Sequence, residues 1–147
     1  MKTIFDTPTR VELINRISLL NENSRSQWGK MTAYQMLKHC RLWDEMAVGK
    51  KQYKQVFMGR VFGKMALRNL LKNDKPLSHN TPTIPDLRII DTGDIEAEKN
   101  KWIAMMEGYA NFSNDNLIHP FFGKMNREQT GCLAYKHTDH HLRQFNV

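Results

Sequence analysis

The chain has 147 residues, a formal net charge of +7 and two cysteines. This length suits one domain with a buried core, so we predict a single domain over residues 1–147. Cys40 and Cys132 lie far apart in the sequence and give no disulfide framework. The N-terminus lacks the apolar stretch of a signal peptide, and no window reaches the roughly 18 apolar residues of a membrane span. We therefore expect a soluble, cytoplasmic protein.

The positive charge is confined to one segment. Between Lys50 and Lys75, eight lysines and arginines stand against one acid, Asp74, which accounts for the whole net charge of +7. A local excess of this kind argues against a domain built to hold a nucleic-acid backbone. Nucleic acid is therefore not an expected partner.

Hydrophobic periodicity and capping boxes predict four helical stretches. The first runs from about Thr9 to Leu20, with Thr9 and Glu12 at capping-box spacing. The second has Thr32 and Gln35 at the same spacing and stops at Gly49. The inward faces of these two stretches are predicted to be Val11, Ile14, Ile17 and Leu20 for the first, and Met36, Cys40, Trp43 and Ala47 for the second.

The third stretch starts near Asp94, and the fourth follows Asn126 as N-cap, with Gln129 three residues on. The segment from Leu117 to Gly123 that precedes the fourth helix has the composition of a turn. The predicted inward faces are Ile95, Trp102, Ile103, Met106 and Ala110 for the third helix, and Thr130, Leu133, Ala134, His137, His141 and Gln144 for the fourth.

About 44 residues separate the second and third of these helices. The front part, Tyr53 to Leu71, alternates apolar and basic residues at four-residue spacing, which predicts an extra amphipathic helix with Phe57, Val61, Met65 and Leu70 as its apolar residues. The back part, Asp74 to Asp91, contains three prolines and should run extended over the surface. We expect an all-α fold in which this long crossover brings two neighbouring helices parallel.

His137 and His141 lie four residues apart, so they share one helix face and two imidazoles can converge on a metal ion. His39 lies on the edge of the inward face of the second helix. Three neutral imidazoles would leave a tetrahedral ion one open position. The spacing alone fits equally well with histidines at the edge of the core that bond to nearby carboxylates.

Several other residues are candidates near these histidines. His140 lies about 100° around the helix from His141, so we place it at the rim, where it orients a ligand or is exposed. Asp44, Asp139 and Gln144 are candidates to orient the imidazoles, and Gln144 is the best supported because it shares the face of His141. Trp43 and Tyr34 are candidate pocket walls, although both also fit the core.

The segment His137-Thr138-Asp139-His140-His141-Leu142-Arg143-Gln144 resembles the end of the last helix in the DinB/YfiT-like family. Trp28-Gly29-Lys30-Met31-Thr32, followed by Met36-Leu37-Lys38-His39, resembles the approach to that family's second-helix histidine, and His119-Pro120-Phe121-Phe122-Gly123 is similar to an uncharacterised bacterial branch. The resemblance covers most of the chain.

This resemblance implies a four-helix bundle of up-down-down-up type, often homodimeric, with a divalent metal held by His39, His137 and His141. Zinc or nickel fits best, although iron and copper also accept three imidazoles. Some relatives are thiol-dependent transferases, so a small-molecule substrate and a low-molecular-weight thiol are expected for a metal-dependent thiol transferase or hydrolase. Met105-Met106 is a candidate dimer surface.

The alternative function is a non-enzymatic, metal-stabilised binding module. In that case the basic segment, residues 50–75, would contact an anionic partner. Three interpretations of this segment stay open, in order of preference: a solvated face that covers the bundle, a surface for an anionic substrate or thiol cofactor, and a docking surface for nucleic acid or anionic lipid.

Overall fold

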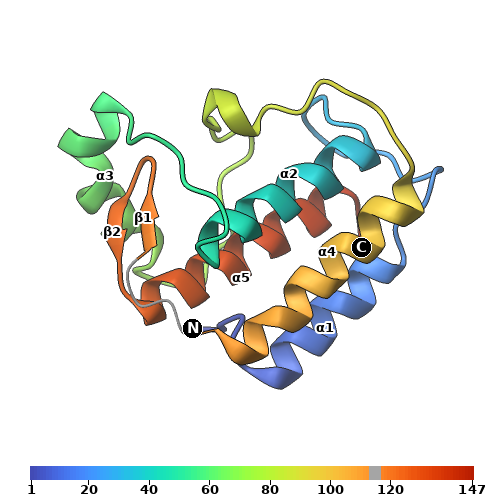
Figure 1. Cartoon of the computed structure of the whole chain (residues 1–147), viewed down its shortest axis with the longest axis horizontal. Coiled ribbons are helices and arrows are strands. Elements are labelled where there is room, and N and C mark those ends of the chain that lie inside the picture. Colours follow the sequence, from blue (N-terminus) through green and yellow to red (C-terminus); the bar gives the residue numbers. More distant parts are fainter. Residues whose placement is uncertain (113–116) are drawn as a thin grey trace.

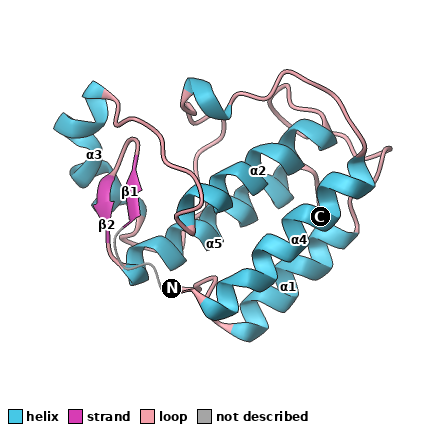
Figure 2. Cartoon of the chain, viewed as in Figure 1, coloured by secondary structure: helices cyan, strands magenta, loops and turns pink. Residues whose placement is uncertain are grey.

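The computed structural model of the chain describes residues 1–112 and 117–147, which are mostly helical with one small two-stranded sheet (Figure 2). In chain order the elements are α1 (Thr7–Ser18), α2 (Ala33–Ala47), α3 (Phe57–Leu70), the 3₁₀ turn η1 (Pro85–Leu87), α4 (Ile95–Gly108), the 3₁₀ turn η2 (Tyr109–Asn111), β1 (Leu117–His119), β2 (Gly123–Met125) and α5 (Arg127–Gln144). The helical content agrees with the expected all-α class.

Helices α1, α2, α4 and α5 surround the hydrophobic core (Figure 1). α2 packs against α4 and α5, and α1 packs against the same two helices. The side chains buried between them include Leu13, Ile17, Met36, Leu37, Met46, Trp102, Met106, Leu133 and Leu142. Because α2 lies directly against α5, a histidine on the former can meet two histidines on the latter.

Three predicted helix starts are confirmed by their caps. Thr32 and Asn126 each accept a hydrogen bond from the backbone N–H three residues on, and the glutamine at that position bonds back to the cap residue. Asp94 caps α4 by accepting from the N–H of Ala97. These local contacts set where α2, α4 and α5 begin, and therefore the register of the histidines.

The predicted start of α1 is wrong. α1 begins at Thr7 rather than Thr9, with Asp6 as its N-cap and a proline in its first turn. Proline is favoured there because its missing N–H would be unpaired anyway. The buried face correspondingly includes Leu13 and Ile17, while Val11 is half exposed.

The connecting segment does form the predicted extra helix, α3, but most of its apolar residues do not pack against the rest of the protein. α3 buries Gly59, Gly63 and Leu67, whereas Phe57, Val61 and Met65 are exposed. The glycines allow the helix backbone to approach the Phe121 backbone closely: a Cβ on Gly63 would stand 2.0 Å from the Phe121 carbonyl oxygen. Figure 1 shows α3 beyond the β-hairpin, at the end of the molecule away from α1 and α4.

The segment expected to be a turn contains a β-hairpin. β1 and β2 pair antiparallel, with Leu117 opposite Met125 and His119 opposite Gly123. Each strand has three residues, too few for an alternating pattern to stand out in the sequence. The Nδ1 atom of His119 accepts hydrogen bonds from the N–H groups of Phe121 and Phe122 and so fixes the turn.

Two further expectations are corrected in α4 and the turn after it. Met105 and Met106 are buried in the core, so they do not form an exposed dimer surface. Ala110 is exposed, because the backbone tightens from α4 into a 3₁₀ turn at Tyr109 and rotates the face that follows. None of the helices in the described residues combines the length and hydrophobicity needed to cross a bilayer.

Candidate metal centre

Three imidazoles converge between α2 and α5. His39 projects from α2, and His137 and His141 project from consecutive turns of α5. One nitrogen from each ring lies within 4.8 Å of the others. Two nitrogens bound to one tetrahedral zinc ion lie about 3.4 Å apart, given Zn–N distances of about 2.0 to 2.1 Å. Shifts of about an ångström or less would bring all three onto one ion, so the donor set fits a metal.

A backbone carbonyl fixes the tautomer of His39. Its Nδ1 lies 2.9 Å from the carbonyl oxygen of Leu87, in the η1 turn. A carbonyl oxygen can only accept, so Nδ1 carries the hydrogen and the neutral ring keeps its lone pair on Nε2. Nε2 is the atom that faces His137. The segment after α3 therefore turns the lone pair of His39 toward the other two histidines.

Gln144 fixes the tautomer of His141. The amide nitrogen of Gln144 donates to the carbonyl of Trp28 at 2.8 Å, which leaves its Oε1 facing Nδ1 of His141 at 2.9 Å. Nδ1 must then carry the hydrogen, and the lone pair of the neutral ring lies on Nε2. Gln144 therefore contacts His141, whose helix face it shares, and it is a second partner of the kind that metal-binding histidines use.

His137 contacts both His39 and the indole ring of Trp43. Its Nε2 is 3.1 Å from Nε2 of His39, and its ring stacks on Trp43 with 4.7 Å between centroids and an interplanar angle of 21°. Because the Leu87 contact leaves Nε2 of His39 with a lone pair, two facing lone pairs would repel unless a proton or a cation lies between them. Because its ring stacks on His137, Trp43 forms one wall of the site as well as part of the core.

Burial favours the neutral form of all three rings. Desolvation lowers the pKa of His39, and it lowers the pKa values of His137 and His141 well below the ordinary value of 6.5, with the neighbouring imidazoles adding to the effect. Neutral imidazole is the form that binds a metal. At neutral pH the three rings are thus ready to act as ligands without releasing protons.

His140 lies outside this group and is buried rather than exposed. Its ring is 5.7 Å from that of Trp28 and 6.4 Å from that of His79, centroid to centroid. Trp28 and His79 stack at 3.8 Å. The offset of about 100° around the helix correctly predicts that His140 is separate from the three converging histidines. The loop that carries Trp28, which covers this side of α5, could not be predicted from that offset.

The two carboxylate candidates do not orient the imidazoles. Asp44 is buried and accepts hydrogen bonds from Trp102 Nε1 and the Tyr109 hydroxyl, both at 2.6 Å. Asp139 pairs with Arg16 and Arg143, at 2.8 and 2.7 Å. Both acids are engaged elsewhere because their own helix faces point away from the histidines.

Cys40 and Tyr34 pack elsewhere in the protein. Cys40 is fully buried next to Met36, and burial raises the pKa of its thiol well above the ordinary value, so the reactive thiolate is disfavoured. Tyr34 is half-buried, with its ring against Gly93 and the Lys38 ammonium near its face. Neither joins the three histidines.

The carbonyls of Leu87 and Trp28 are parts of the site that the sequence did not reveal. Both belong to connecting segments, and a backbone carbonyl has no side-chain signature. The only available signal was that each neutral histidine ligand needs an acceptor for its second nitrogen.

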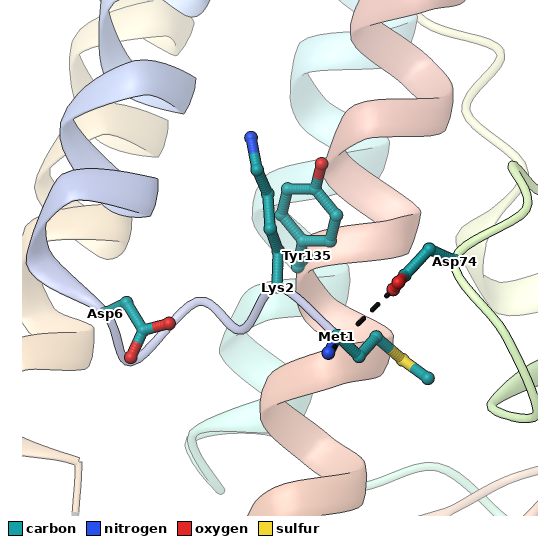
Figure 3. A pocket seen from close by; sticks show the side chains of 5 residues that line it. All are labelled: Met1, Lys2, Asp6, Asp74 and Tyr135. Carbon is teal, nitrogen blue, oxygen red and sulfur yellow. Dashed lines mark ion pairs between the residues drawn. The ribbon is translucent and has the colours of Figure 1, made fainter.

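A surface hollow lies apart from this centre (Figure 3). It is lined by Met1, Lys2, Asp6, Asp74 and Tyr135, and the N-terminal ammonium group lies 4.0 Å from the Asp74 carboxylate. None of the histidines lines it. The converging imidazoles remain the group with metal-binding chemistry among the described residues.

Comparison with known proteins gives a family but no characterised relative. No curated protein and no solved structure matches the chain, and the relationship to DinB/YfiT-like proteins stays a hypothesis. Residues 5–147 match a family described as a protein of unknown function (DUF1569). Since this match spans nearly the whole sequence, the chain belongs to the DUF1569 family.

Proposed function

We propose that the chain binds one divalent metal ion through Nε2 of His39, His137 and His141. The observation that carries this proposal is the pair of fixed tautomers: Leu87 and Gln144 hold Nδ1–H on two of the rings, so their Nε2 lone pairs are free for a common ligand. Zinc or nickel suits such a set, and iron and copper share its ligand preference.

We infer further that the protein is a metal-dependent enzyme of the thiol-transferase or hydrolase type, acting on a small molecule. A metal held by three histidines keeps an open position and lowers the pKa of a water or thiol bound there. In this proposal Gln144 and the Leu87 carbonyl keep the imidazoles oriented. Trp43 shields the centre from bulk water on one side.

The overall arrangement would then be a single four-helix bundle of DinB/YfiT type over residues 1–147, with α3 as an insertion in the long crossover. The packing of α2 against both α4 and α5 supports this topology. It also means that the three proposed ligands come from two helices that pack against each other.

Metal analysis of protein purified without a histidine tag tests the site. We expect about one equivalent of a transition metal per chain, and its loss in His137→Ala and His141→Ala variants. The matched control is His79→Gln, because His79 is exposed and lies outside the group. A folded protein that takes up no metal, or a His137→Ala/His141→Ala double variant that keeps it, would overturn the proposal.

The competing function is a binding module in which a metal serves stability alone. Turnover of small electrophiles with several low-molecular-weight thiols, and of ester and amide substrates, separates the two. A rate that disappears with chelation and in His137→Ala supports the enzyme. Stoichiometric metal with no metal-dependent rate across these substrates supports the binding module.

A further inference from the structure

We propose that α3 is a peripheral membrane-docking helix that binds anionic lipid surfaces. Five of its large apolar side chains face solvent, between 44% and 75% exposed: Phe57, Met58, Val61, Phe62 and Met65. At about 100° per residue they cover an arc of about 140° on one side of the helix. Monomeric proteins rarely leave such a continuous apolar face uncovered without a binding role.

The way α3 is attached leaves this face free. Gly59 and Gly63 lie against the Phe121 backbone, so the helix is held by its small residues and turns its large ones outward. The N–H of Val56 donates to the Pro120 carbonyl, and the Lys64 ammonium donates to the Lys124 carbonyl. The helix is thus fixed to the hairpin.

The C-terminal end of α3 is attached to α5. The ammonium of Lys136, on α5, donates to the carbonyls of Leu70, Asn73 and Lys75 at 3.0, 2.5 and 2.8 Å. Both ends of α3 are therefore attached, and the helix lies at one end of the molecule (Figure 1) with its large apolar side chains exposed. Because α3 is already ordered in the free protein, binding a partner does not require the loss of conformational entropy that forming a helix would cause.

The cations beside the exposed apolar face of α3 favour a negatively charged partner. No acidic residue occurs from position 46 to position 73, and that stretch contains seven cations. Arg60, Lys64 and Arg68 border the apolar arc and are exposed. An interfacial helix with apolar residues on one face and Lys or Arg beside them matches both parts of an anionic bilayer, its acyl chains and its headgroups.

The same features disfavour two other occupants. In a symmetric contact with a second copy, the cations bordering one α3 would face their own equivalents, with no acid in the segment to pair with them. Nucleic acid would satisfy the cations but would leave the apolar arc in contact with phosphates and water. A lipid surface accommodates both sets of side chains.

Sedimentation of the full-length protein with vesicles tests this proposal. We expect at least tenfold tighter binding to phosphatidylcholine vesicles containing 30% phosphatidylserine, a composition chosen for the assay, than to pure phosphatidylcholine. Arg60→Gln/Arg68→Gln should weaken binding by about 25-fold, at roughly fivefold per cation. Phe57→Ser/Val61→Ser should weaken it at least tenfold.

Matched controls come from surfaces distant in sequence from α3. Val11→Ser removes an apolar side chain that is 51% exposed on α1, and Arg25→Gln removes an exposed cation from a loop. Both should bind vesicles like the unaltered protein. All substituted positions are exposed, so thermal unfolding should show that each variant is folded.

Three results would overturn the proposal. The first is absent or equal binding to the two vesicle types, and the second is binding that the α3 variants leave unchanged. The third is another occupant: a dimer by light scattering that Phe57→Ser/Val61→Ser dissociates, or DNA retention lost only in Arg60→Gln/Arg68→Gln, with no vesicle binding in either case.

Discussion

Gln144 and His141, one turn apart on α5, are joined by a 2.9 Å hydrogen bond that fixes which imidazole nitrogen carries the proton. Replacing Gln144 with leucine removes the acceptor and also leaves the Trp28 carbonyl unpaired. We expect metal affinity to fall by about 10- to 100-fold. Competition with a chromophoric chelator measures this loss, and Gln52→Leu, at an exposed position, serves as its control. Equal affinity in both variants would remove Gln144 from the site.

Metal removal should lower stability. An ion that binds only the folded chain stabilises it by about 2.7 kcal/mol at a free concentration of 100 times its Kd. We therefore expect a chelator to lower the Tm of the purified protein, and readdition of zinc to restore it. In His137→Ala the Tm should not respond to either reagent. A chelator response that persists in this variant would place the stabilising metal elsewhere.

Asp44 should make stability depend on pH. Burial raises the pKa of its carboxyl from 3.8 to about 7, although Trp102 and Tyr109 donate hydrogen bonds to it. The folded protein then holds a proton that the unfolded chain releases, so the contribution of Asp44 to the free energy of unfolding should fall as pH rises from about 4 to about 7.

Asp44→Asn isolates this contribution, because the amide imitates the protonated acid. Other groups, including the histidines, titrate equally in both proteins. Urea unfolding at several pH values should show the stability of the native protein declining relative to that of Asp44→Asn across this range. A difference that does not change with pH would show that Asp44 is ionised in the folded state.

Replacing Gly63 of α3 with alanine should destabilise the contact between α3 and the hairpin. A Cβ at position 63 would stand 2.0 Å from the Phe121 carbonyl oxygen, so Gly63→Ala must displace α3 or the hairpin, at a cost of about 1 to 3 kcal/mol. Faster tryptic cleavage within residues 50–75 would report the displacement. Gly108→Ala is the matched control, since nothing lies within 4 Å of its added Cβ, and it should not speed cleavage.

Local signals in the sequence predicted the helix starts at Thr32, Asp94 and Asn126, because a cap involves residues only three apart. They also placed His137 and His141 on one inward face. The orientation of α3 could not be predicted in this way. Its apolar spacing predicted an amphipathic helix, but the side that packs on the protein is the one with the glycines, because they allow close backbone approach to Phe121. That approach depends on a hairpin formed about 60 residues later in the chain.

The convergence of the three histidines was predictable because their side-chain chemistry marks them as candidate metal ligands. The elements that orient them were not: the Leu87 and Trp28 carbonyls lie in irregular segments, and any residue type would supply the same oxygen. Asp44 and Asp139 have suitable chemistry and nearby positions, yet their partners are set by long-range packing against α4 and α1.

The contact between His39 and His137 joins residues 98 positions apart in the sequence. An isolated α5 peptide would carry two of the proposed ligands, but it would lack the third imidazole and the carbonyls that orient the set. Bringing such distant groups together costs chain entropy that only the folded core repays. Metal occupancy should therefore act as a reporter of native assembly, rising only when the N-terminal and C-terminal halves of the chain have docked.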